Sequence, residues 1–348
     1  MKAVIYYGPK DIRIEDRPIP VPGENDVVIK VVRAGICGSD LTAYLYDGSR
    51  VGIFKNGEMG VDGQFGHEMA GVVYAIGEKI TDIQVGDRVF VNPTTCKRNG
   101  MLGCDMAGAF SEYVLIEDAV YGNNLLKLED GVSFDEAVIV EPLAVGTHGK
   151  NCIGVKAHEH VVVFGAGTIG LCTLNALIAS GCHKPVVVDI NSSRLEYVRQ
   201  MGGVPFNPET DGSLKDFLLD HFGSVINPFM ARCADVDAYI DCAGAPGIIE
   251  QITGFAKNDA RIAIVAVYKK PITFDVAPFA APRLLMKGST GYDIPDIVEA
   301  LNHVSGHRTK VLDIVTHHFP HSRAVEAFAA AADPGTGAIK VLIDYEEG

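Results

Sequence analysis

Hydrophobic and polar positions alternate in short segments over the first 147 residues, as expected for strands that bury one face. The alternation is clearest at residues 3–6 and 27–32, and further apolar segments follow at 71–77, 85–91 and 109–114. Glycine and aspartate residues lie between these segments and mark turns. The pattern predicts a small barrel-like β unit in this part of the chain.

From about residue 148 to 290, uninterrupted apolar runs alternate with helical segments. The runs that we expect to be strands lie at residues 161–164, 185–188, 237–242 and 261–267. Continuous apolar runs are typical of parallel strands buried on both faces, and the alternation of strand and helix is typical of α/β folds. A mixed pattern follows, with amphipathic stretches at 297–304 and 322–331 and a last strand at 339–343.

A glycine-rich turn joins the first of these apolar runs to a helix. The turn fits the pattern G-x-G-x-x-G, in which the first glycine makes a tight turn, the second lets the backbone approach a pyrophosphate and the third lets helix and strand pack closely. The phosphates would lie at the helix N-terminus, where N–H groups and the helix dipole favour anions. The residues predicted to bind a dinucleotide here are Gly165, Gly167, Thr168, Ile169 and Gly170.

Asp189 ends the second apolar run, where an acid can bind the adenosine ribose hydroxyls. A carboxylate at this position would repel a 2′-phosphate, so the sequence favours NAD over NADP. Arg194 lies a few residues further on and could soften that preference. The alternative is an ordinary surface aspartate after a strand.

Composition narrows the class of protein. The chain has 348 residues, 47% of them hydrophobic, with a formal net charge of −14. This length suggests about two domains, and the acidity argues against nucleic acid or an anionic membrane as a partner. Neither a signal peptide nor a membrane-spanning run is visible, and the eight cysteines form no C-x-x-C pair. We therefore expect a cytoplasmic protein without disulfides.

Four residues are candidate metal ligands. Cys37, His67 and Glu68 offer a thiolate, an imidazole and a carboxylate, which are all zinc ligands. The signal is weak, because Cys37 is distant in sequence from the other two and because a lone cysteine or histidine is more often an ordinary core or surface residue. Glu141 interrupts the apolar run 138–145, and a buried carboxylate is costly unless it is paired or bound to a metal. The alternative for Glu141 is an exposed loop before a helix that starts at Pro142.

In combination, these motifs resemble the zinc-dependent medium-chain dehydrogenase/reductase superfamily over essentially the whole chain. The carrying segments, in order, are Gly35-Ile36-Cys37-Gly38-Ser39-Asp40, Gly66-His67-Glu68, Val85-Gly86-Asp87-Arg88-Val89, Glu141-Pro142-Leu143-Ala144-Val145 and the glycine turn. The acid in Glu141-Pro142-Leu143 is similar to the sorbitol (polyol) and butanediol dehydrogenase branch. The resemblance implies an α/β protein with a GroES-like β-rich catalytic domain and a Rossmann domain. Its expected parts are 1–147, the Rossmann domain 148–290, and a return segment 291–348 that completes the catalytic domain.

The resemblance also implies roles for single residues. Cys37, His67 and Glu68 match ligands of one catalytic zinc, and Glu141 matches a fourth acid that binds directly or through water. Ser39 matches the hydroxyl that relays the substrate proton, and Asp40 matches the acid that orients the ligand histidine. Lys340 is similar to the C-terminal basic residue that reaches the cofactor phosphates, and its alternative is a strand-edge lysine.

Three features depart from, or extend, the family pattern. Cys96 and Cys104 are the two cysteines in a region where many relatives bind a structural zinc with four, so we expect no structural zinc. Thr42 stands where relatives often have a histidine of the outer proton path, which Tyr44 or the cofactor ribose could complete. The stretch 48–64 is similar to an insertion in butanediol-type enzymes and is expected to shape one wall of the substrate pocket.

The leading hypothesis is a zinc-dependent, NAD-linked oxidoreductase that interconverts a secondary alcohol (a polyol, vicinal diol or cyclitol) and its ketone by hydride transfer. The alternatives are an L-threonine-type 3-dehydrogenase, a zinc-free quinone-reductase-like enzyme and a non-catalytic nucleotide-binding protein. The partner is expected to be a small polar alcohol or ketone. A homodimer or homotetramer is also expected, in which the run 261–267 near the sheet edge could pair across a two-fold axis.

Overall fold

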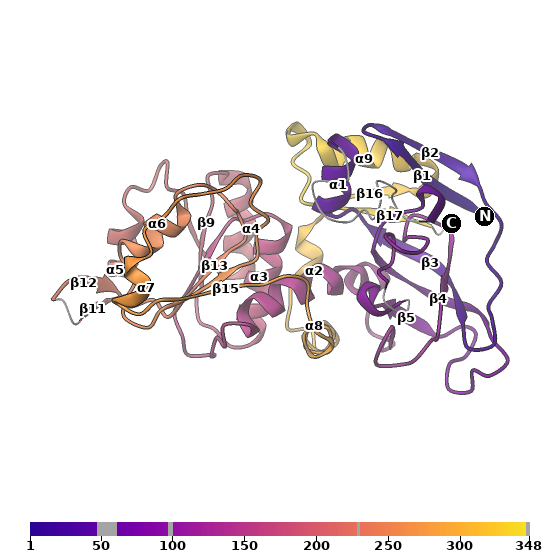
Figure 1. Cartoon of the computed structure of the whole chain (residues 1–348), viewed down its shortest axis with the longest axis horizontal. Helices are drawn as coiled ribbons and strands as arrows, with labels where there is room; N and C mark the ends of the chain where they lie inside the picture. The colour runs from indigo at the N-terminus through magenta and orange to yellow at the C-terminus, as the bar shows by residue number, and fades with distance from the viewer. Residues whose placement is uncertain (47–60, 97–99, 228–229, 346–348) are drawn as a thin grey trace. The chain divides into compact units, whose positions relative to one another are not determined.

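The computed structural model describes residues 1–46, 61–96, 100–227 and 230–345, and the chain divides into two units (Figure 1). Unit 1 consists of Met1–Glu141 and Val315–Gly348, and unit 2 of Pro142–Ile314. The first boundary lies inside one continuous helix, α2 (Phe134–Asn151). The sequence pattern therefore shows no break there. In the described parts of the chain, no helix combines the length and the apolarity needed to cross a membrane.

The second boundary differs from the expected one, because the return to unit 1 begins at Val315 and not at residue 291. The intervening helix, α8 (Ile294–Ser305), contacts α3 (Thr168–Ala179) in unit 2. Ile297, Ala300 and Val304 make its buried face. The amphipathic pattern predicts this face correctly, but it does not say which unit the face packs against.

Unit 1 is built on a sheet with the strand order β16-β17-β3-β4-β5-β7, and β6 pairs with β3. Strand β17 comes from the C-terminal segment and pairs antiparallel with β3, so the two ends of the chain share one sheet (Figure 1). Its other helices are α1 (Gly38–Leu45) and α9 (Ala324–Ala332). The strands of unit 1, including the separate hairpin β1–β2, are β1 (Lys2–Gly8), β2 (Asp11–Asp16), β3 (Val27–Gly35), β4 (Glu68–Ile76), β5 (Arg88–Val91), β6 (Tyr113–Ile116), β7 (Leu125–Lys127), β16 (Val315–Pro320) and β17 (Lys340–Asp344).

Aromatic rings form the centre of the unit 1 core. Phe328 of α9 lies with its ring centroid 5.2 Å from Phe110 and 5.5 Å from both Phe65 and Tyr44. Phe65, Phe110 and Phe328 are fully buried. The core thus joins α9, from the end of the chain, to segments from its first third.

Unit 2 has a six-stranded parallel sheet with the order β10-β9-β8-β13-β14-β15. Numbered along the chain, this is the order 3-2-1-4-5-6 of a dinucleotide-binding fold. Its strands are β8 (Val161–Phe164), β9 (Val186–Val188), β10 (Val204–Phe206), β13 (Ala238–Asp241), β14 (Arg261–Ile264) and β15 (Leu285–Gly288), with a separate hairpin of β11 (Ser224–Ile226) and β12 (Arg232–Ala234). The remaining helices are α4 (Ser192–Met201), α5 (Leu214–Phe222), α6 (Ile248–Thr253) and α7 (Ala277–Ala280).

The run 261–267 lies near the sheet edge, as expected, but it does not contain the edge strand itself. The strand in this run is β14, which ends at Ile264 and lies between β13 and β15. Strand β15 occupies the edge in its place. It is short and largely exposed, so its sequence lacks the apolar run that marks the interior strands.

Candidate active site

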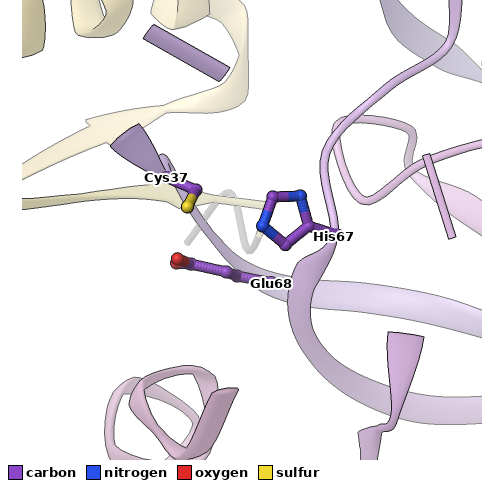
Figure 2. Close-up of side chains that lie close together, drawn as sticks. All are labelled: Cys37, His67 and Glu68. Carbon is purple, nitrogen blue, oxygen red and sulfur yellow. The ribbon is translucent and has the colours of Figure 1, made fainter. Parts of the chain in front are cut away.

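Cys37, His67 and Glu68 meet in unit 1. One ligand atom from each lies within 4.8 Å of the others, and Figure 2 shows the three side chains turned toward a common point. His67 and Glu68 are buried and Cys37 is half-buried. The structure therefore brings together three of the four predicted ligands.

Local structure explains why these side chains converge. Cys37 is the N-cap of α1, two residues after the end of β3, and its backbone N–H donates to the Asp40 carboxylate at 2.9 Å. Glu68 begins β4 and lies opposite Gly35, the last residue of β3. Because β3 and β4 are antiparallel neighbours, the end of β3 and the start of β4 lie side by side. Cys37, His67 and Glu68 therefore lie at the same end of these two strands.

The site is strongly anionic. Burial opposes the charged form of His67, but the nearby Cys37, Asp40 and Glu141 outweigh it and raise the pKa of His67 well above its ordinary value. Asp40 lies with Oδ1 3.8 Å from His67 Nδ1 and is 1% exposed. Burial raises the pKa of Asp40 to about 6, although His67 lowers it. These groups favour a positive charge at the position where they meet.

Glu141 lies on α2 and is 5% exposed, so the expectation of a buried carboxylate is met and the exposed-loop alternative is not. Pro142 lies within α2 and does not start it. Glu141 is outside the group of three ligand atoms, but it is close enough to raise the pKa of His67. It can therefore serve as a more distant carboxylate of the same site.

The hydroxyl of Ser39 is buried and has no hydrogen-bond partner among the described residues. A buried hydroxyl without a partner is costly, which is a reason to expect a ligand there. The hydroxyl of the neighbouring Thr42 instead donates to the Gly38 carbonyl at 2.9 Å, and the ring of Tyr44 packs in the core against Phe328. The Ser39 hydroxyl thus differs from that of Thr42 in having no described hydrogen-bond partner.

The residues present fit a zinc ion. A thiolate, an imidazole and a carboxylate are the donors zinc prefers, and a catalytic site keeps one position open. The negative charge that raises the pKa of His67 and the orphaned hydroxyl of Ser39 agree with a cation and a polar ligand.

Lys340 lies beside Glu68 in unit 1, a contact that the sequence does not predict. Its ammonium lies 2.8 and 2.7 Å from the two carboxylate oxygens of Glu68, and it donates to the Ile36 carbonyl at 3.0 Å. It is 2% exposed on a strand that has neighbours on both sides, so the strand-edge alternative does not hold. The sequence predicts that Lys340 lies on a strand, but it does not predict which strands lie next to that one.

The segment around Cys96 and Cys104 is held by ordinary protein contacts where the structure describes it. Cys96 is fully buried, burial raises the pKa of its thiol, and the thiol donates to the Asn92 carbonyl at 2.8 Å. Neither cysteine belongs to a group of potential metal ligands among the described residues. Of the stretch 48–64, residues 48–60 lie outside the described residues.

The glycine turn of unit 2 has the predicted form. Gly165 has φ of 98°, and Gly167 is the N-cap of α3 without a side-chain cap. A Cβ on Gly170 would lie 1.8 Å from the Gly165 carbonyl oxygen, so only glycine allows this approach of helix to strand. Thr168 and Ile169 form the first turn of α3, where a phosphate can bind.

Asp189 follows β9 and lies beside this turn. One of its carboxylate oxygens accepts a 2.6 Å hydrogen bond from the Ala166 N–H, and the other accepts from the Asn191 N–H at 2.7 Å. A guanidinium nitrogen of Arg194 lies 3.9 Å from where a Cβ of Gly167 would be. Both charged residues therefore lie at the glycine turn, as the sequence predicts.

The sequence analysis did not single out Gly35 and Asp241, although both have clear structural roles. Gly35 leaves room for Glu68, because a Cβ there would lie 2.0 Å from the Glu68 carboxylate. Asp241, fully buried at the end of β13, accepts from the backbone of Ala243 and Gly244 and from the Tyr268 hydroxyl at 2.6 Å. The available signal for Asp241 was an acid at the carboxyl end of an apolar run, where ligands bind in such sheets.

A second group of potential ligands, His148, Asp293 and Asp296, lies in unit 2. His148 Nδ1 lies 2.7 Å from Asp296, and the two aspartates form the capping box of α8. These contacts explain why the three side chains lie together, so the group has a structural role.

Comparisons with known proteins agree with this geometry. Family models for the alcohol dehydrogenase GroES-like domain and for zinc-binding dehydrogenases match residues 23–130 and 168–306. The chain is 29% identical to sorbitol dehydrogenase 1 of Saccharomyces cerevisiae, covering 98% of this chain and 97% of that one. It is also 29% identical to human sorbitol dehydrogenase, covering 94% and 91%. The structure of 2R,3R-butanediol dehydrogenase from Bacillus subtilis has a TM-score of 0.85 at 26% identity, covering 99% of both chains. The chain belongs to the zinc-dependent medium-chain dehydrogenase/reductase superfamily, in its sorbitol and butanediol dehydrogenase-like branch.

Proposed function

We propose that the protein is a zinc-dependent, NAD-linked dehydrogenase that interconverts a secondary alcohol bearing a neighbouring hydroxyl with its ketone. The observation that carries this proposal is the meeting of Cys37, His67 and Glu68 within 4.8 Å. The names of the yeast, human and Bacillus subtilis relatives, which refer to sorbitol and butanediol, support a polyol or vicinal diol.

Each residue of the site has a part in this chemistry. Cys37, His67 and Glu68 would hold the zinc, with Glu141 as a further carboxylate, and the zinc would supply Lewis-acid polarisation of the substrate oxygen. Ser39 accepts the proton of the substrate hydroxyl and passes it on. Asp40 fixes the orientation of His67. Glu68 and Glu141 are poor neighbours for an alkyl chain, which favours a polar substrate such as a polyol, diol or cyclitol.

The cofactor and assembly are also part of the proposal. Asp189 at the glycine turn supports NAD over NADP, while Arg194 is the residue that could admit a 2′-phosphate.

We propose one zinc for each chain, since Cys96 and Cys104 alone cannot fill a four-thiolate site. A cytoplasmic homodimer or homotetramer is proposed as well, and β15 is an exposed edge strand of the unit 2 sheet that could pair with a second copy.

The test is NADH formation by the purified protein with a panel of alcohols. We expect turnover of sorbitol, xylitol, 2,3-butanediol or inositol, and much weaker turnover of 2-butanol, which matches the diol but lacks its second hydroxyl. A preference for L-threonine would support the threonine-type alternative. Zinc-independent reduction of quinones, or NADH binding without any turnover, would contradict the proposal in favour of the other two alternatives.

A further inference from the structure

Asp241 connects three loops at one end of the unit 2 sheet. It is the last residue of β13, which pairs with β8 on one side and with β14 on the other. One carboxylate oxygen accepts from the N–H groups of Ala243 and Gly244, both at 2.9 Å, and the other accepts from the Tyr268 hydroxyl in the loop after β14. Ala243 also touches the glycine turn, because a Cβ on Gly165 would lie 3.1 Å from the Ala243 Cβ. Asp241 thus lies where the loops after β8, β13 and β14 meet.

The carboxylate of Asp241 has hydrogen-bond donors but no basic partner. All three contacts are donated to it, as to an ionised carboxylate, which only accepts. Burial and this contact raise the pKa of Tyr268 well above its ordinary value, so the phenol keeps the proton that it donates. Asp241 is fully buried and takes part in no ion pair with any residue that the structure describes. Asp296, also a buried carboxylate of unit 2, instead lies 2.7 Å from His148.

The strand order indicates which part of a dinucleotide would bind near Asp241. In this fold each half of the sheet binds one mononucleotide, and the dinucleotide crosses the sheet where the strand order reverses. That point lies between β8 and β13. Asp189, after β9, is the acid expected at the adenosine ribose, so the nicotinamide half belongs to β13, β14 and β15. Asp241 is at the carboxyl end of the first of these strands, the end at which ligands bind.

The nicotinamide ring carries a positive charge in NAD⁺ and no charge in NADH. A buried carboxylate without a cation is costly, and a positive ring nearby offsets part of this cost. We propose that the charge of Asp241 makes the site favour the oxidised cofactor, so that NAD⁺ is captured and NADH is released more readily. This inference rests on the proposed NAD site and deepens it. At an effective dielectric constant of about 20, a unit charge about 12 Å away changes the binding constant of a charged ligand about tenfold.

The experiment measures the dissociation constants of NADH and NAD⁺ for the full-length protein. NADH binding is followed by its fluorescence, and NAD⁺ binding by displacement of NADH. Asp241→Asn removes the charge but keeps the size of the side chain and an oxygen that can accept from the backbone. We expect the dissociation constant of NADH divided by that of NAD⁺ to fall about tenfold, because NAD⁺ binds more weakly. Asp296→Asn is the matched control, since its carboxylate has a basic partner, and it should leave this ratio unchanged.

An unchanged ratio in Asp241→Asn would overturn the inference, even if both cofactors bind more weakly, because Asp241 would then act only by holding the loops. If this variant does not fold, Tyr268→Phe decides. It leaves the carboxylate with two donors instead of three, so less of its charge is neutralised and the ratio should rise; a ratio that stays the same or falls would overturn the inference. A wild-type protein that binds neither NADH nor NAD⁺ is a different result, because it refutes the proposed NAD site itself.

Discussion

The second and third glycines of the turn in unit 2 should have separable roles, one in cofactor binding and one in stability. A Cβ on Gly170 would lie 1.8 Å from the Gly165 carbonyl oxygen and 2.8 Å from its carbonyl carbon. Both are backbone atoms of the turn, so α3 and β8 would have to move apart by more than about 1 Å. Overpacking of this kind costs about 3 kcal/mol.

For a domain of this size, about 3 kcal/mol corresponds to a fall in Tm of roughly 6–12 °C. Gly170→Ala should therefore lower the Tm of unit 2 by this amount, and it should weaken NADH binding only as a consequence of the distorted turn. Thermal unfolding followed by circular dichroism measures the first effect, and titration of NADH fluorescence measures the second.

Gly167→Ala is the matched control. Gly167 has φ of −76°, and a Cβ there would have only a guanidinium nitrogen of Arg194 within 4 Å, at 3.9 Å. We expect an unchanged or slightly higher Tm, because alanine restricts the unfolded chain. NADH affinity should fall at least about tenfold, or about 1.4 kcal/mol, because the methyl group occupies the approach of the pyrophosphate. A stable Gly170→Ala variant, or a destabilised Gly167→Ala variant with normal NADH affinity, would refute this assignment.

Three further predictions concern separate parts of the molecule. Ser39→Ala should lower kcat about 100-fold, as for loss of an acid–base group, with little change in Tm because its hydroxyl has no described partner; steady-state kinetics and thermal unfolding check this. Phe328→Ala should destabilise unit 1 by about 3–5 kcal/mol in urea unfolding, since it removes a fully buried ring, and the transition of unit 2 should not move. The pKa of Glu299 is lowered from 4.5 by hydrogen bonds with His303, Lys150 and Asn151, against the opposing effect of burial. A lowered carboxyl pKa stabilises the folded state above pH 4.5 and loses this effect as pH falls through the folded value, so Glu299→Gln should be less stable than wild type near pH 7 and approach it in acid.

Features encoded by neighbouring residues could be predicted from the sequence. The glycine turn and Asp189 at the end of its strand each follow from a local pattern, and the structure has both. For Glu141 the local pattern allowed both a buried carboxylate and an exposed loop, and in the structure the residue is buried. Cys37 and His67 were identified by a family resemblance, because their spacing alone carries little information about contact. The structure then brings them together through the antiparallel pairing of β3 and β4.

Features that depend on distant pairing could not be predicted in the same way. Lys340 meets Glu68 only because β17 returns to pair with β3, next to β4. Strand β15 is exposed and short, so no hydrophobic pattern marks it, and the more apolar β14 was the last strand of this sheet that we predicted. The assignment of α8 to unit 2 likewise depends on which helix it packs against, which its own amphipathic pattern does not specify.

Zinc content tests the central claim most directly. It is measured as zinc per chain in protein purified without added metal, for wild type, Cys37→Ser and Cys182→Ser, whose buried thiol lies in unit 2 and serves as a control. The proposal predicts about one zinc in wild type and Cys182→Ser, and loss of zinc together with NAD-dependent diol oxidation in Cys37→Ser. A folded wild-type protein that binds NADH but contains no zinc would contradict the account, and about two zincs would contradict the expectation that the segment around Cys96 and Cys104 binds none.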